Sequence, residues 1–382
     1  MPNPPIYLDS NSTTPLLPEV WEAMRPYALD VFANPASAHQ AGRAARRALE
    51  DNRERLAALL GAYPDEVVFT SGATEANNLA IASLAGDPPG ELIASALEHP
   101  SVTEPVAHLA RHGFRHVEWP VSPEGVVRLD ALPGLLRPET RLVALMLVNH
   151  ETGAIQPVRE TESHAGRLSY VHCDAVQAVG KIPVDFHALG IATLSLSAHK
   201  FHGPRGVGAL LVRRGVRLRP LTRGGHQQQG RRPGTEPVAL VVGLVAALER
   251  AVETMTTRAE KVRLLRRTML AGIDDARPFV VNGSADGLAS TLNVSFPGLR
   301  ADALLMSLDL AGVACSTGAA CSSGSLLPSP VLRAMGLSED VLRSALRFSF
   351  HAGLEEADMA EAARRVVGVV TRLRGCPDEP EA

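Results

Sequence analysis

The sequence has few cysteines, no excess of basic residues and no long run of apolar residues. Four cysteines in 382 residues are too few for a disulfide framework in a chain of this size. We therefore expect a reducing, cytoplasmic compartment, in which an unusual cysteine is reactive rather than structural. Lys plus Arg total 38 against 41 for Asp plus Glu, so the basic excess typical of nucleic-acid-binding proteins is missing.

The sequence also predicts no membrane-spanning segment and no targeting segment. The longest apolar run, residues 238–248, is too short to span a bilayer, which takes about 20 residues. The first five residues lack the charged and apolar regions of a signal peptide. Hydrophobic residues at 45% and charged residues at 21% are typical of a globular protein, and the length favours two domains.

Short apolar runs alternate with amphipathic stretches along the first 212 residues. Continuous apolar strands alternating with helices predict an α/β fold, with a mostly parallel sheet covered on both faces. Residues 237–274 read as a bent or broken helical connector to a second, smaller α+β unit. Strands are expected at 66–70, 92–95, 114–118, 141–148, 170–173, 193–197, 206–212, 290–296 and 346–350, and helices at 73–84, 102–112, 158–168, 301–308 and 354–373.

Three polar segments follow predicted strands, at the edge where open α/β sheets bind ligands. Ser71-Gly72-Ala73-Thr74 opens a helix, whose free N–H groups suit a phosphate. The same residues are also compatible with an ordinary capped helix start that binds no ligand. Asp174 ends a strand and either pairs with a cationic nitrogen or is solvated. Lys200 stands before a Gly-Pro turn, where a rigidly held lysine becomes nucleophilic; the alternative is a surface lysine.

Lysine is scarce in this chain, and Lys181 and Lys200 are the two lysines among the first 260 residues. A lysine nucleophile, an upstream aspartate and a phosphate cradle together suggest pyridoxal 5'-phosphate. The lysine would form a Schiff base with the aldehyde, and Asp174 would keep the ring nitrogen protonated.

A loop of small residues carries the remaining chemistry. Cys321 lies in the middle of residues 314–325, where no large side chain is present, and we expect an exposed, reactive thiol there. Cys315 ends an apolar run, so we expect it to pack against other apolar side chains. Cys173 is expected in the core and Cys376 in a frayed tail. A metal site from Cys315, Cys321 and His172 lacks any standard ligand spacing, so we expect no metal.

Several motifs spread over nearly the whole chain are specific in combination. They are YLD at 7–9, NPAS at 34–37, FTSGATE at 69–75, EH at 98–99, DAVQ at 174–177, SAHK at 197–200, GT at 234–235, ACSSGS at 320–325 and LRFS at 346–349. With these motifs the chain resembles the cysteine desulfurases of the NifS/IscS type, in the class-V aminotransferase group of fold-type I pyridoxal-phosphate enzymes.

The resemblance implies an architecture and a role for each matching residue. The large, mostly parallel, seven-stranded-type sheet domain would span residues 15–255. Residues 1–14 and 256–382 would form the small α+β domain, which carries the mobile cysteine loop at about 315–328. Lys200 would hold the cofactor, and His99 would stack on its ring and move protons. Asp174 and Gln177 would bind the ring, and the cofactor phosphate would be bound by Ala73, Thr74, Ser197 and His199. Thr235 would bind the cofactor phosphate in the partner subunit of a homodimer, and the substrate would be bound by Asn34 and Arg347.

One position departs from the family pattern. Family members often read Asn-Asn-Glu where this chain reads Asn149-His150-Glu151. The second Asn usually contacts the ring hydroxyl of the cofactor. Here either His150 makes that contact, or Asn149 and Gln177 replace it.

The predicted function is the conversion of L-cysteine to L-alanine, with a persulfide left on Cys321 for a sulfur-acceptor protein such as an iron–sulfur scaffold or a thiolation enzyme. Selenocysteine lyase and class-V aminotransferase are alternatives within the fold, but a plain aminotransferase has no use for a loop thiol. A non-catalytic scaffold is disfavoured because Lys200, Asp174, His99 and Cys321 are all present.

Overall fold

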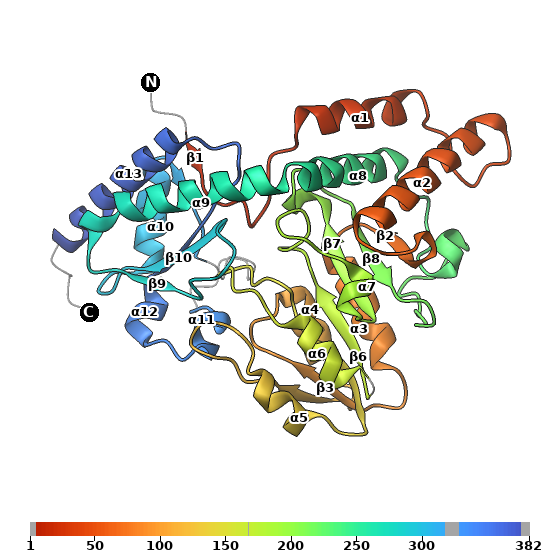
Figure 1. Cartoon of the computed structure of the whole chain (residues 1–382), viewed down its shortest axis with the longest axis horizontal. Helices are drawn as coiled ribbons and strands as arrows, with labels where there is room; N and C mark the ends of the chain where they lie inside the picture. Colours follow the sequence, from red (N-terminus) through yellow and green to blue (C-terminus); the bar gives the residue numbers. More distant parts are fainter. Residues whose placement is uncertain (1–4, 167, 318–327, 376–382) are drawn as a thin grey trace.

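The computed structural model describes residues 5–166, 168–317 and 328–375. Its largest element is a seven-stranded sheet in which every strand except β8 points the same way (Figure 1). This confirms the expected α/β fold with a mostly parallel sheet. The spatial order is β2 (Val67–Thr70), β8 (Gly208–Val212), β7 (Thr193–Ser197), β6 (Tyr170–Asp174), β5 (Thr140–Ala144), β3 (Glu91–Ala94) and β4 (Arg115–Glu118).

Helices cover both faces of this sheet, because successive strand residues point to opposite sides. Phe69 and Leu196 pack on one face in a core shared with α2 (Gln40–Leu59) and α8 (Val238–Glu253). On the other face, α3 (Ala73–Ala85) and α4 (Pro100–Ala110) pack against alternate residues such as Val68 and Leu92. No helix is predicted before residue 66, and there the structure adds α1 (Pro18–Leu29) and α2.

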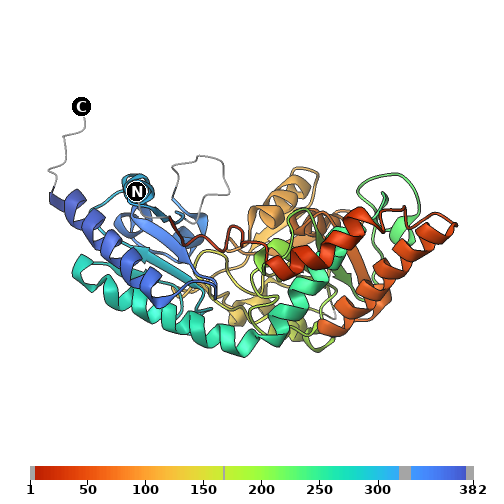
Figure 2. The same cartoon turned by 90° about the horizontal axis from the view of Figure 1, so that it is seen from above.

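A second, smaller sheet lies in the other half of the chain and has its own apolar core. Its antiparallel strands are ordered β12 (Ala345–Ser349), β10 (Thr291–Ser295) and β9 (Val280–Asn282). The helices that pack with it are α9 (Met255–Gly272), α10 (Ala301–Leu310) and α13 (Glu356–Gly375), and α9 and α13 lie side by side in Figure 2.

The helical connector is broken, as its length predicted. It consists of α8 and α9, which are separated at Thr254 and run one after the other from the large sheet to the small one (Figure 1). The predicted strand 141–148 is shorter than expected, because β5 ends at Ala144. The remaining elements are β1 (Ile6–Tyr7), which pairs with β11 (Val313–Ala314), and the short helices α5 (Leu132–Leu135), α6 (Val158–Ala165), α7 (Phe186–Leu189), α11 (Pro330–Ala334) and α12 (Glu339–Arg343).

In the residues that the structure describes, no helix is both long and apolar enough to cross a lipid bilayer.

Candidate active site

Polar side chains gather beyond the carboxyl ends of β3, β5, β6 and β7. These strands are parallel, so their ends share one edge of the sheet. His99 follows β3, His150 follows β5, Asp174 ends β6 and Lys200 follows β7. Residues from distant parts of the sequence are thereby brought together, as the strand-end positions predicted.

Lys200 is held by the N-terminal segment of the chain. It closes a short 3₁₀ turn directly after β7 and is half-buried. Its Nζ donates to the carbonyl oxygens of Asn11, at 2.6 Å, and Ser12, at 2.8 Å. The amine therefore has a defined position, and Lys200 is not the freely solvated surface lysine that the sequence left as an alternative.

Asp174 is a buried carboxylate held entirely by neutral donors. Its Oδ1 accepts from the Val176 N–H at 3.0 Å, and its Oδ2 accepts from Asn77 Nδ2 at 2.7 Å. The Asn77 amide is oriented in turn by the ring of His172, whose Nε2 lies 3.0 Å from Asn77 Oδ1. Asp174 has no ion pair among the described residues, so it can accept a cationic nitrogen from a bound ligand.

His99 caps the N-terminus of α4 with its own ring. Its Nδ1 accepts from the Ser101 N–H at 3.1 Å, so in the neutral ring the proton lies on Nε2. Burial lowers the pKa of His99, and the charges of Lys200 and Arg347 lower it further, against the opposing effect of Asp174. His99 is therefore held neutral near pH 7, with Nε2 as its proton donor.

His150 stands against His99 with their ring centroids 5.3 Å apart and the ring planes nearly perpendicular. Burial and the neighbouring cationic groups keep the pKa of His150 well below its usual value. Its Nδ1 is buried and has no hydrogen-bond partner among the described residues. The Asn149 side chain, in contrast, is fully used: its Oδ1 accepts from the Glu151 and Thr152 N–H groups and its Nδ2 donates to Leu97 O.

A hydrogen-bonded chain links Lys200 to a second lysine. Lys181 Nζ donates to Gln177 Oε1 at 2.6 Å, and Gln177 Nε2 donates to the same Asn11 carbonyl oxygen that accepts from Lys200. The Asn11 amide donates to the carbonyl oxygen of His150. Asn11 thus connects four site residues, and Gln177 has both of its polar atoms engaged.

Arg347 enters the site from β12 and is 3% exposed. Its Nη2 pairs with Asp9 Oδ1 at 2.7 Å and donates to Ser12 Oγ, and its Nη1 donates to the His150 carbonyl oxygen. The Nε atom is buried without a partner in the described part of the chain. One donor of a buried guanidinium is therefore free for an acidic ligand.

The start of α3 offers uncapped N–H groups at the same edge of the sheet. Gly72 precedes the helix with φ at +155°, and no side chain of the described residues caps the first helical N–H groups, which belong to Ala73 and Thr74. Ser197 lies next to this turn, since a Cβ on Gly72 would meet Ser197 Oγ at 3.7 Å. His199 is tied to Thr13 through its Nδ1, 3.1 Å from Thr13 Oγ1, and burial together with Lys200 lowers its pKa to about 4.

Two predicted site residues lie elsewhere in the single chain. Asn34 and Thr235 line a separate groove between the end of α1 and the start of α8. Cys321, the predicted nucleophile, lies outside the described residues, as does Cys376. Cys173 is fully buried and Cys315 packs against the second core, as expected, and burial raises the pKa of Cys315 to about 12.

Sequence reasoning missed three residues that support the site, Asn11, Asn77 and Lys181. None lies directly at the end of a predicted strand, so strand ends alone did not identify them. The scarcity of lysine was a usable signal for Lys181. Its position four residues beyond Gln177, on the same turn, allows the hydrogen bond between the two side chains.

Comparisons with known proteins show the family of the chain. The model of the aminotransferase class-V family matches residues 6–361. The chain is 40% identical to cysteine desulfurase IscS of Dictyoglomus turgidum, over 97% of this chain and 95% of the relative, and 43% identical to a cysteine desulfurase of Trichormus azollae, over 97% and 94%. Among solved structures, a NifS-like protein superposes with a TM-score of 0.91 at 34% identity, covering 97% of this chain and 100% of the other; SspA in complex with cysteine gives 0.81 at 36%, covering 90% and 98%.

Proposed function

This chain belongs to the class-V aminotransferase family, a family of pyridoxal-phosphate enzymes, and from that premise we propose that it is a cysteine desulfurase. Its reaction takes sulfur from L-cysteine and releases L-alanine. The observation that carries the proposal is the near-full-length identity with several cysteine desulfurases, together with the set of lysine, aspartate and histidine at one sheet edge.

The described residues fit pyridoxal 5'-phosphate as the cofactor. The site offers a lysine amine, a buried carboxylate without a cationic partner and an uncapped helix start beside Ser197. When bound, the cofactor withdraws electrons from the substrate and weakens the bonds at its Cα. Its binding residues would be Lys200 through Nζ, Asp174 at the ring nitrogen, His99 at the ring face, His150 and Gln177 at the ring hydroxyl, and Ala73, Thr74, Ser197 and His199 at the phosphate.

His150 suits the ring hydroxyl better than Asn149. The Asn149 amide is occupied by its own loop and by the carbonyl oxygen of Leu97, whereas Nδ1 of His150 has no partner among the described residues. The departure from the family's usual asparagine therefore keeps a polar atom available.

Proton transfer falls to Lys200 and His99. Lys200 Nζ, once its charge is removed, takes the proton from the substrate Cα and later returns a proton. His99 is neutral and carries its proton on Nε2. It can donate this Nε2 proton to the substrate and take a proton back at the same nitrogen. Both groups are half-buried, which limits competing exchange with water.

Arg347 is proposed to bind the substrate carboxylate. Its Nε, which has no partner among the described residues, and the positive charge of the buried guanidinium suit an acidic group. The Asp9 pair fixes the guanidinium before substrate arrives. Asn34 is proposed to assist.

Sulfur transfer is proposed for Cys321. Its thiolate attacks the substrate sulfur, the bond between that sulfur and Cβ breaks with its electrons going to carbon, and protonation of Cβ gives alanine. The persulfide remains on Cys321 until an acceptor protein takes the sulfur. An iron–sulfur scaffold or a thiolation enzyme has the required chemistry.

We keep the division into residues 15–255 and a small domain of 1–14 and 256–382, with the cysteine loop in the latter, as part of this proposal.

A homodimer completes the proposed site. Trp21, Leu29 and Phe32 are 50%, 61% and 77% exposed along α1 and the segment after it. This is the same region that forms the groove with Asn34 and Thr235. Covering these apolar side chains with a second copy would stabilise the dimer and would let Thr235 reach the partner's cofactor phosphate. The low cysteine content supports a reducing, cytoplasmic location.

The function is tested by incubating the holoenzyme with L-cysteine and measuring alanine, sulfide and protein-bound persulfide. Cys321→Ser should keep the cofactor's visible absorption and bind cysteine, yet release no alanine. Cys315→Ser is the matched control, because its thiol is packed and its pKa is raised by burial. A Cys321→Ser enzyme that forms alanine at the wild-type rate, or a persulfide found on Cys315, would contradict the assignment.

A further inference from the structure

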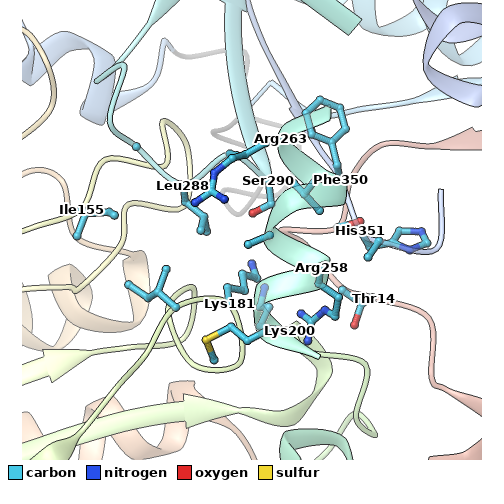
Figure 3. A pocket seen from close by; sticks show the side chains of 18 of the residues that line it. Thr14, Ile155, Lys181, Lys200, Arg258, Arg263, Leu288, Ser290, Phe350 and His351 are labelled. Atoms are coloured by element: carbon cyan, nitrogen blue, oxygen red, sulfur yellow. The ribbon is translucent and has the colours of Figure 1, made fainter. Parts of the chain in front are cut away.

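A cavity of about 170 Å³ separates the two halves of the molecule behind Lys200 (Figure 3). Arg258 and Arg263 reach it from α9, and Lys181 from the turn after β6. Ser290 borders it just before β10. No contact in the proposed reaction uses these groups, apart from the bond between Lys181 and Gln177.

The lining of this cavity carries a strong excess of positive charge. Lys181, Lys200, Arg258 and Arg263 are basic, and the acidic residue in the lining is Asp286, which is exposed. Lys181, Arg258 and Arg263 form no ion pair with any described residue. Arg258 donates to the carbonyl oxygens of Gly180 and Ala251, so it is held by dipoles and not by a counter-charge.

Holding cations together without a counter-charge costs free energy. Burial, together with the charges of Lys200, Arg258 and Arg347, lowers the pKa of Lys181 to about 7. No acidic group offsets this effect. An anion in the cavity would supply the missing charge.

Two hydroxyl groups beside these cations also lack partners. Ser10 and Ser290 are 2% and 7% exposed, and neither Oγ has a hydrogen-bond partner among the described residues. Both residues line the cavity. In Figure 3, Lys181, Arg263 and Ser290 approach the space from different elements. Buried hydroxyls normally have partners, so these two are available to a ligand.

We propose that this cavity is a binding site for a small oxyanion, held by Lys181 and Arg263 with Ser290 as a hydroxyl donor. The ligand class is a compact group of negatively charged oxygens, as in phosphate, sulfate or a carboxylate. The site is separate from the proposed cofactor phosphate site, since neither Thr74 nor Ser197 lines the cavity. Through Lys181 and Gln177 it is linked to the active site by hydrogen bonds.

The test is a titration of the cofactor-loaded enzyme with phosphate, sulfate and acetate at constant ionic strength, with chloride as the reference salt. The readout is the thermal unfolding midpoint, which rises saturably when a ligand binds the folded state. Loading the cofactor first fills the proposed phosphate site at α3. The three anions separate tetrahedral from carboxylate ligands.

Arg263→Gln is the principal variant, because Arg263 is exposed and its loss should leave the fold intact. Removing one charged hydrogen bond should weaken anion binding by about tenfold or more. Lys181→Met should weaken it similarly. Arg267→Gln on the same helix is the matched control and should bind as the wild type does, because Arg267 does not line the cavity. No saturable shift with any of the three anions, or equal affinity in all four proteins, would overturn the proposal.

Discussion

The residues of the candidate site divide into those that face a ligand and those that hold them. Asn77 fixes Asp174, Ser101 fixes His99 and Asn11 fixes Lys200. Each holding residue uses a neutral hydrogen bond, which sets a position without cancelling the charge that the chemistry needs. The hydrogen bonds that position Asp174, His99 and Lys200 therefore all lie within one chain.

Replacing Lys200 by Ala should abolish both the visible absorption of the bound cofactor and alanine formation, because the amine that would hold the cofactor is lost. Lys200→Arg should not restore either, since a guanidinium stays protonated. Absorption spectroscopy and an alanine assay check this. Lys261→Ala, which removes a partly exposed lysine paired with Glu355, is the control and should keep both properties.

Glu98 supplies a pH-dependent contribution to stability. Its Oε1 accepts from the Met146 N–H, its Oε2 is buried without a partner in the described part of the chain, and burial raises the pKa of Glu98 to about 8. The folded state therefore binds this proton more tightly than the unfolded state does. The resulting stability is present below the unfolded pKa of about 4.5 and is lost as the pH rises through about 8.

Glu98→Gln should accordingly reduce the loss of unfolding free energy between about pH 5 and about pH 9. Urea unfolding at several pH values measures the slope. Glu118→Gln on the exposed edge strand is the control and should leave the slope unchanged. An identical slope in the wild type and in Glu98→Gln would show that Glu98 is ionised in the folded protein.

At the scale of elements, the turn from β2 into α3 is built around backbone that favours glycine. Gly72 has φ at +155°, and a Cβ on Gly208 of the neighbouring β8 would meet Gly72 Cα at 2.9 Å. The turn thus packs tightly against β8 while its N–H groups stay uncapped. The glycine at the turn and the start of the helix could be read from the short sequence between strand and helix, whereas the close packing on Gly208 depends on the tertiary structure.

Gly72→Ala should weaken cofactor binding and lower the free energy of unfolding by roughly 1 kcal/mol or more, because a Cβ is strained at this φ. Cofactor titration and urea unfolding measure the two effects. Gly134→Ala is the control, since Gly134 lies in α5 with nothing within 4 Å of an added Cβ. Unchanged cofactor affinity in Gly72→Ala would remove α3 from the phosphate site.

At the scale of the whole molecule, the single chain leaves large apolar side chains exposed on α1 and after it. Phe32→Asp should shift the proposed dimer toward monomer, because it places a charge among apolar groups that a partner would cover. Sedimentation velocity measures the change. Leu310→Asp is the control, since Leu310 is 88% exposed on α10, in the other half of the chain. A monomeric wild type would contradict the dimer.

The sequence by itself determined the strands of the large sheet and the residues that follow them, but not the two helices before residue 66. Apolar runs located the strands of the large sheet within a few residues, and Asp174 and Lys200 stood where those strands end. The break between α8 and α9 also followed from length alone. These features depend on short-range periodicity and turn chemistry, which a local stretch of sequence carries.

Only the tertiary structure decided which residues hold the site and where charge remains uncompensated. Asn77 meets Asp174 across 97 residues, Gln177 meets Asn11 across 166, and Lys200 meets Asn11 across 189. The proposal that His150 and not Asn149 meets the ring hydroxyl likewise rests on which side chain the surrounding described residues already satisfy. Such contacts follow from how distant segments pack, and no local pattern encodes them. The cationic cavity between the two halves exists for the same reason.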